Sequence, residues 1–152
     1  MQEFYRRLVK EELNRYTIFK ESVGSISSQI RELEAKKFKS GVTSYDINPG
    51  KPSSDGGVFT KEEIRIININ SKIDLLTRNR EKALAHIDRM EGAMECLDYK
   101  EKDILLGLYG NCGRRDGKLN ALIDKYNYEK SHLYRIANYS LEKISYRLYG
   151  DA

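Results

Sequence analysis

Residues 64–97 read IRIININSKIDLLTRNREKALAHIDRMEGAMECL, and apolar side chains recur along them at alternating intervals of three and four. From residue 66 onward the alternation passes through Ile66, Ile69, Ile73, Leu76, Arg80, Ala83, Ile87, Met90, Met94 and Leu97, and Arg80 is the one member that is not apolar. This spacing keeps the side chains on one face of an α-helix and is the repeat of coiled coils. Thr60 and Glu63 add the T-x-x-E pattern of a helix N-terminus. The sequence therefore predicts one helix over about 60–97.

A β-strand is the alternative for the start of this stretch. IRIININ, residues 64–70, alternates apolar and polar residues and is rich in β-branched isoleucine. A strand would need a partner of matching period, and the sequence shows none. The helical register that begins at Ile66 continues through the following turns, so we prefer the helix.

A similar apolar stripe precedes it. Its members are Tyr16, Phe19, Val23, Ile26, Ile30 and Leu33, again spaced by three and four. Between the stripes lies SGVTSYDINPGKPSSDGG, residues 40–57, which holds both prolines of the chain and predicts a loop within 40–59. Two long helices separated by such a loop favour an antiparallel, coiled-coil-like hairpin over 1–97.

A hairpin of two helices buries one stripe per helix and leaves the remaining surface to be covered. We expect a second copy to cover it, which predicts a homodimer, and the alternative cover is the C-terminal part of the chain folding back. The predicted oligomerisation residues are Ile66, Ile69, Ile73, Leu76, Ile87 and Met90.

Composition limits the function. The 152 residues leave no room for a large enzyme, and the net charge of +4 means that any nucleic-acid site must be a local patch. The chain has no secretory signal and no apolar run near 18 residues, so we expect a cytoplasmic protein in which the thiols of Cys96 and Cys112 are reduced.

The heptad pattern stops at Asp98, and residues 98–152 follow a different organisation. Asp98 and Glu101 form a D-x-x-E cap for a helix that should end near Gly110. GNCGRRDG, residues 110–117, predicts a loop, and LNALIDKY, residues 119–126, a short helix. Asn127 tolerates the left-handed conformation that ends a helix, so a third helix should begin near Glu129.

That third helix has two contrasting sides. Leu133, Ile136, Ser140, Leu141 and Ile144 are the positions expected in the core. The side left outside carries hydrogen-bonding and cationic residues without an acid: Lys130, Ser131, His132, Tyr134, Arg135, Asn138 and Tyr139. A short helix, a tight turn and a longer helix of this kind are typical of a helix-turn-helix, which makes the chain all-α with a DNA-binding domain at 98–152.

The segments LDYKEKDILLGLY (97–109) and LNALIDKYNYEKSHLYRIANYSLEKI (119–144) resemble region four of bacterial sigma factors, and nearly the whole chain resembles the ArpU/RinA-type phage transcription regulators. The resemblance implies sequence-specific binding of double-stranded DNA and control of phage genes in a bacterial host. If the protein activates transcription, host RNA polymerase is a further expected partner. The resemblance places Lys130, Ser131, His132, Tyr134 and Arg135 against bases and phosphates. Ile123 replaces the alanine usual in the family, which predicts a wider crossing of the last two helices. The longer loop before them adds Arg114, Arg115 and Lys118 as candidate phosphate contacts.

Other functions have weaker support in the sequence. A small DNA-packaging (terminase) subunit and a coiled-coil adaptor that acts on RNA polymerase without binding DNA are the rival interpretations. GNCG, residues 110–113, matches the GxxG loop of KH domains, but no strand pattern surrounds it. His86 is a lone histidine that we expect to be solvated, and no motif indicates a metal, a cofactor or catalysis. We therefore predict a protein that is not an enzyme.

Overall fold

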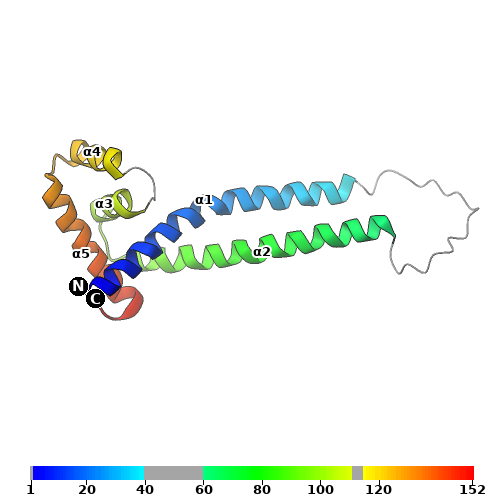
Figure 1. The fold of residues 1–152 in the computed structure, drawn as a ribbon, viewed down its shortest axis with the longest axis horizontal. Coiled ribbons are helices and arrows are strands. Elements are labelled where there is room, and N and C mark those ends of the chain that lie inside the picture. The colour runs from blue at the N-terminus through cyan, green and yellow to red at the C-terminus, as the bar shows by residue number, and fades with distance from the viewer. Residues whose placement is uncertain (1, 40–59, 111–114) are drawn as a thin grey trace, which may run out of the picture. The chain divides into compact units, whose positions relative to one another are not determined.

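The computed structural model describes residues 2–39, 60–110 and 115–152, and every regular element in these ranges is an α-helix (Figure 1). The helices are α1 (Glu3–Lys39), α2 (Lys61–Met94), α3 (Tyr99–Tyr109), α4 (Arg115–Tyr126) and α5 (Lys130–Tyr149). The all-α prediction is confirmed for this part of the chain. IRIININ lies within α2, so the helix and not the strand is correct. The loop predicted within 40–59 lies outside the described residues.

The chain divides into two compact units, to both of which α1 and α2 contribute. The first unit comprises Met1–Ser22 and Ala83–Ala152, and the second comprises Val23–Lys82. This division by packing differs from the functional division expected between residues 97 and 98. The functional division stays a prediction.

Two capping boxes set the starts of α2 and α3. The Glu63 amide donates to Thr60 Oγ1 (3.2 Å), and the Thr60 amide donates to the Glu63 carboxylate (2.6 Å). Asp98 and Glu101 exchange the same bonds, at 2.7 and 3.0 Å. Both predicted caps are confirmed. However, α2 ends at Met94 and not near 97, because the chain turns there, with the Leu97 amide bonded to the Met94 carbonyl (3.0 Å), before Asp98 caps α3.

In the second unit, residues 23–39 of α1 and 61–82 of α2 run side by side (Figure 1). The two predicted stripes supply the core of this helix pair. Ile30 and Ile69 are buried, but Leu33, Ile73 and Leu76 remain half-buried. Two helices alone thus close this core incompletely.

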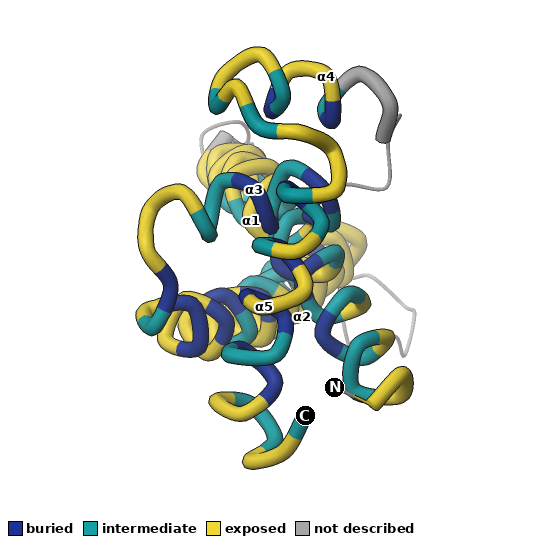
Figure 2. Tube along the Cα trace, turned by 90° about the vertical axis from the view of Figure 1, so that its left-hand side faces the viewer, coloured by how far each residue is buried: buried dark blue, intermediate teal, exposed yellow. Residues whose placement is uncertain are grey.

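The first unit has a closed core, visible as the buried segments of α3 and α5 in Figure 2. Its fully buried side chains come from several helices and include Val9, Leu13, Met90, Ile104, Leu105, Leu133, Leu141 and Ile144. Of the core positions predicted on α5, Ile136 is half-buried and the other four are buried. Ala137 and Ser145 also lie in the core.

The contact between α3 and α4 depends on a glycine. A Cβ atom on Gly107 would lie 2.9 Å from a terminal methyl carbon of Leu122. The absence of a side chain at Gly107 therefore lets Leu122 of α4 pack closely on α3.

The start of α4 differs from the prediction. The helix begins at Arg115, four residues before the expected start at Leu119, so residues 115–117 of the predicted loop are helical. Its first turn, Arg115–Lys118, carries no apolar residue that could have revealed the helix by periodicity. The other end agrees with the sequence: Asn127 has a φ of 52°, the left-handed conformation expected where α4 stops.

Candidate nucleic-acid interface

The turn between α4 and α5, residues 127–129, orients the candidate DNA-binding helix. The Asn127 amide closes α4 by donating to the Ile123 carbonyl (2.7 Å), and Glu129 is extended, with φ −66° and ψ 151°. Glu129 makes no capping bond through its side chain. The first turn of α5 therefore keeps backbone amides that can bind an anion.

The predicted DNA-contacting residues of α5 are accessible to different degrees. Lys130, Ser131, Arg135 and Asn138 are exposed, and His132 and Tyr134 are half-buried. Leu133, Ala137 and Leu141, on the opposite side of the same helix, are fully buried. Since the first acidic residue of α5 is Glu142, the accessible side of its first three turns is free of acids, and the nearest acid is Glu129 at the N-cap.

A chain of aromatic contacts runs from the turn to Arg135. The rings of Tyr126 and Tyr128 are stacked (centroids 6.0 Å apart), and Tyr128 meets His132 edge to face at 4.7 Å. The Arg135 guanidinium lies 2.8 Å from His132 Nδ1. Because a guanidinium only donates, Nδ1 is the acceptor, and this bond holds Arg135 in one orientation. Apart from the spacing of residues 128, 132 and 135, nothing in the sequence indicated these contacts.

Asp103 fixes the end of α4 to α3. Its carboxylate accepts hydrogen bonds from Lys125 Nζ and from the Tyr126 hydroxyl, both at 2.7 Å. The bond from Lys125, and then that from Tyr126, hold the pKa of Asp103 below its ordinary value. The same carboxylate raises the pKa of Lys125 and of Tyr126. The charge of Lys125 is thus neutralised within the protein.

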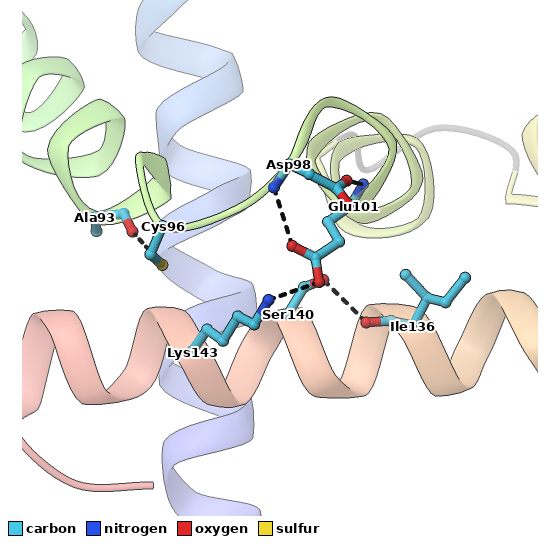
Figure 3. Close-up of polar contacts among 7 residues, drawn as sticks. All are labelled: Ala93, Cys96, Asp98, Glu101, Ile136, Ser140 and Lys143. Carbon is cyan, nitrogen blue, oxygen red and sulfur yellow. Dashed lines mark hydrogen bonds and ion pairs between the residues drawn. The ribbon is translucent and has the colours of Figure 1, made fainter.

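Glu101 plays a similar part between α3 and α5 (Figure 3). One carboxylate oxygen completes the capping box with Asp98, and the other accepts from Lys143 Nζ at 2.7 Å. This bond is the largest cause of the raised pKa of Lys143. The Lys143 ammonium also lies 4.5 Å from the centre of the Tyr139 ring. Charged hydrogen bonds therefore anchor both α4 and α5 to α3.

The three residues proposed for a second phosphate contact are less well defined. Lys118 is half-buried on α4. Arg114 lies outside the described residues, and Arg115 opens α4 with a side chain that is likewise outside them. Lys118 is therefore the one member of this group whose side chain is described, and it belongs to the same unit as α5.

The predicted oligomerisation residues face the interior of the chain. Ile69, Ile87 and Met90 are buried, and Ile66, Ile73 and Leu76 are half-buried. Met90 is fully covered within a single copy, so it offers no surface to a second one. Any interface between copies must draw on the half-buried members and on apolar residues that point outward.

The expectation that His86 is solvated is wrong. Its side chain is 14% exposed, lies between α1 and α2 in the first unit, and places Nε2 3.0 Å from a Glu12 carboxylate oxygen. The Phe19 ring meets it edge to face at 5.1 Å. Residue 86 adjoins the stripe position 87, so the turn of the helix brings it to the edge of the helix contact.

The structure adds two negative findings for the described ranges. Their helices include none that combines the length and apolar character needed to cross a membrane. Their histidines, cysteines and acids nowhere gather in a group of three or more that could bind a metal. The Cys96 thiol is free and lies 3.2 Å from the Ala93 carbonyl oxygen (Figure 3), while Cys112 is outside the described residues.

No protein-family model, no curated protein and no solved structure matches this chain.

Proposed function

We propose that this protein is a sequence-specific DNA-binding regulator of transcription, of phage or prophage type, in which α4, the turn 127–129 and α5 form a helix-turn-helix. The observation that carries the proposal is the two-sided first half of α5. Its apolar side is fully buried, and its other side exposes Lys130, Ser131, Arg135 and Asn138 without an acid among them. A rigid helix of this kind meets the requirements for reading base edges in the major groove.

Each exposed residue type has a chemical use on DNA. An arginine guanidinium binds guanine with two hydrogen bonds, and an asparagine amide does the same for adenine. A lysine at the first turn, together with the free amides there, binds phosphate. In this proposal Arg135 and Asn138 read bases, Lys130 binds the backbone, and the bond from Arg135 to His132 preorders the guanidinium.

The proposal assigns self-association to the α1–α2 pair, arranged as the predicted hairpin. A dimer brings two copies of α5 to successive major grooves, so the target site should be repeated or palindromic. The likeness to sigma region four makes host RNA polymerase the expected partner where the protein activates transcription.

Selection of bound sequences from random duplex DNA tests the proposal. We expect the parent protein to enrich one motif and Lys130→Glu/Arg135→Glu to enrich none. The matched control is Arg31→Glu/Arg78→Glu, which reverses two exposed arginines of the second unit and should keep the motif. Melting temperatures must agree among the three proteins. Equal enrichment by the parent and the α5 variant would refute the assigned surface.

Two further outcomes would replace the proposal. A ring of eight or more copies in solution indicates a DNA-packaging subunit, which also combines a DNA-binding helix with an oligomerising region. No affinity for duplex DNA at low salt indicates a protein-interaction adaptor, since charge-driven binding is strongest there.

A further inference from the structure

One side of the helix pair in the second unit is hollowed by a groove between α1 and α2. Two adjoining cavities, of about 710 and 340 Å³, make up this groove, and both are lined by Leu33, Lys36 and Lys72. All lining residues belong to the second unit. Among the described residues of this unit, no third helix covers the groove.

The groove is lined by aliphatic side chains. The lining includes Leu33, Ile69 and Leu76, which are members of the predicted stripes, and also Ile64 and Leu75 of α2. Ile64 is 49% exposed and Leu75 is 59% exposed. Their separation of eleven residues is close to three helical turns, so both lie on one face of α2. A partner helix would bury this row as a continuous strip.

The charges along the groove indicate what kind of partner fits. Glu32 and Glu62 supply acids, and Lys36, Lys61, Arg65 and Lys72 supply bases. A nucleic acid would meet the two carboxylates unfavourably. A surface that carries both signs around an apolar strip fits a second copy of itself when a two-fold axis turns the acids of one copy toward the bases of the other.

We infer that this groove is the surface on which a second copy of the chain docks, groove against groove, so that two helix pairs form a four-helix arrangement. The exposed faces of Ile64 and Leu75, and not the covered stripe at Ile87 and Met90, then carry the contact. Burial of half-exposed aliphatic residues is the driving force. The inference rests on the self-association in the proposed function but not on DNA binding, and the test measures mass without DNA.

The test is the mass of the full chain in solution, by sedimentation and light scattering over a range of concentrations. We expect a dimer for the parent. Ile64→Glu/Leu75→Glu should raise the dissociation constant roughly 100-fold or more, because dimerisation would bury two introduced carboxylates per copy against an apolar strip. The control is Ile18→Glu/Leu84→Glu, which makes the same chemical change at two exposed aliphatic residues of the first unit and should remain dimeric. Circular dichroism checks that helicity is unchanged.

Charge exchange tests whether the partner is the chain itself. Lys36→Glu/Lys61→Glu/Arg65→Glu/Lys72→Glu makes the charged lining of the groove wholly acidic, and Glu32→Lys/Glu62→Lys makes it wholly basic. Each variant alone should associate more weakly than the parent, and an equal mixture should form heterodimers.

Three results would overturn the inference: a monomeric parent, which leaves the groove to residues 40–59 or to another protein; a dimer that survives Ile64→Glu/Leu75→Glu; or no association in the mixture. A dimer of the expected behaviour that binds no DNA would overturn the proposed function and leave the interface intact.

Discussion

The same apolar repeat, spaced by three and four, runs through both units of the molecule and produces two different cores. In the first unit Leu13 of α1 and Met90 of α2 are fully buried, whereas in the second unit Leu33 and Leu76 stay half-buried. The first unit contains α3, α4 and α5 in addition to its segments of α1 and α2, whereas the described helical residues of the second belong to α1 and α2 alone. A helical repeat thus determines which side chains face inward, and the number of packed helices determines how far they are buried.

The two capping boxes show the same contrast. Thr60 and Glu63 form an isolated box at the start of α2 in the second unit. Glu101 of the first unit makes the equivalent bonds with Asp98 and also accepts from Lys143 of α5. The same local motif therefore caps one helix in the open unit and links two helices in the closed one. Closure fits the proposed role of the first unit in presenting α5, and openness fits the proposed docking of a second copy on the second unit.

The largest effect we expect comes from truncating one leucine in each unit. Leu13→Ala should lower the free energy of unfolding by about 3 kcal/mol, because it leaves a cavity in a closed core. Leu33→Ala should cost about 1 kcal/mol at low protein concentration, because water already reaches this side chain. Urea denaturation followed by circular dichroism measures both.

Protein concentration sharpens this comparison. If a second copy covers the groove, the cost of Leu33→Ala should grow as concentration rises through the range of dimerisation, and the cost of Leu13→Ala should stay constant. Equal costs for the two variants at every concentration would show that the units do not differ in closure.

The second prediction concerns Glu101 and Glu63, the glutamates of the two capping boxes. Glu101→Ala should cost about 1–2 kcal/mol, because it removes a cap and leaves Lys143 without its carboxylate. Glu63→Ala should cost less, since it removes the cap alone from an exposed helix end. Lys143→Met separates the contribution of the cap from that of the bond between Lys143 and Glu101. In a Lys143→Met background, Glu101→Ala and Glu63→Ala should lower the free energy of unfolding by similar amounts. A larger loss from Glu63→Ala than from Glu101→Ala would contradict the anchoring role of Glu101.

The sequence predicted the parts of this fold that depend on local chemistry. Apolar spacing indicated the long helices, the T-x-x-E and D-x-x-E patterns placed two helix starts, and Asn127 marked the end of α4. The inward side of α5 followed from periodicity alone, with Ile136 less buried than expected. These features arise within one or two helical turns, where residue type determines geometry directly.

Features that depend on distant residues were missed. Three such features join segments far apart in the chain: the placement of His86 beside Glu12, the hydrogen bonds that Asp103 accepts from the end of α4, and the groove between α1 and α2. A single sequence does not show which distant segments of the chain contact one another. The polar first turn of α4 was missed for another reason, because it lacks the periodic apolar residues by which a helix is recognised.

The smallest effect that we expect is the loss of stability caused by Asp103→Asn, which depends on pH and should be confined to the first unit. The pKa of Asp103 is held below its ordinary 3.8, first by the bond from Lys125 and then by that from Tyr126. A depressed pKa in the folded state means that the ionised carboxylate stabilises the fold above about pH 4, and that this contribution disappears as the pH falls through the folded value. Asp103→Asn should therefore lower the melting temperature by about 2 °C at pH 7, and by progressively less as the pH falls through the folded pKa of Asp103. Hydrogen exchange provides the regional measurement: at pH 7 the variant should loosen the amides of α4 and leave those of α2 residues 66–80, in the second unit, unchanged. Equal loosening of both segments would mean that Asp103 supports the whole chain and not the contact between α3 and α4.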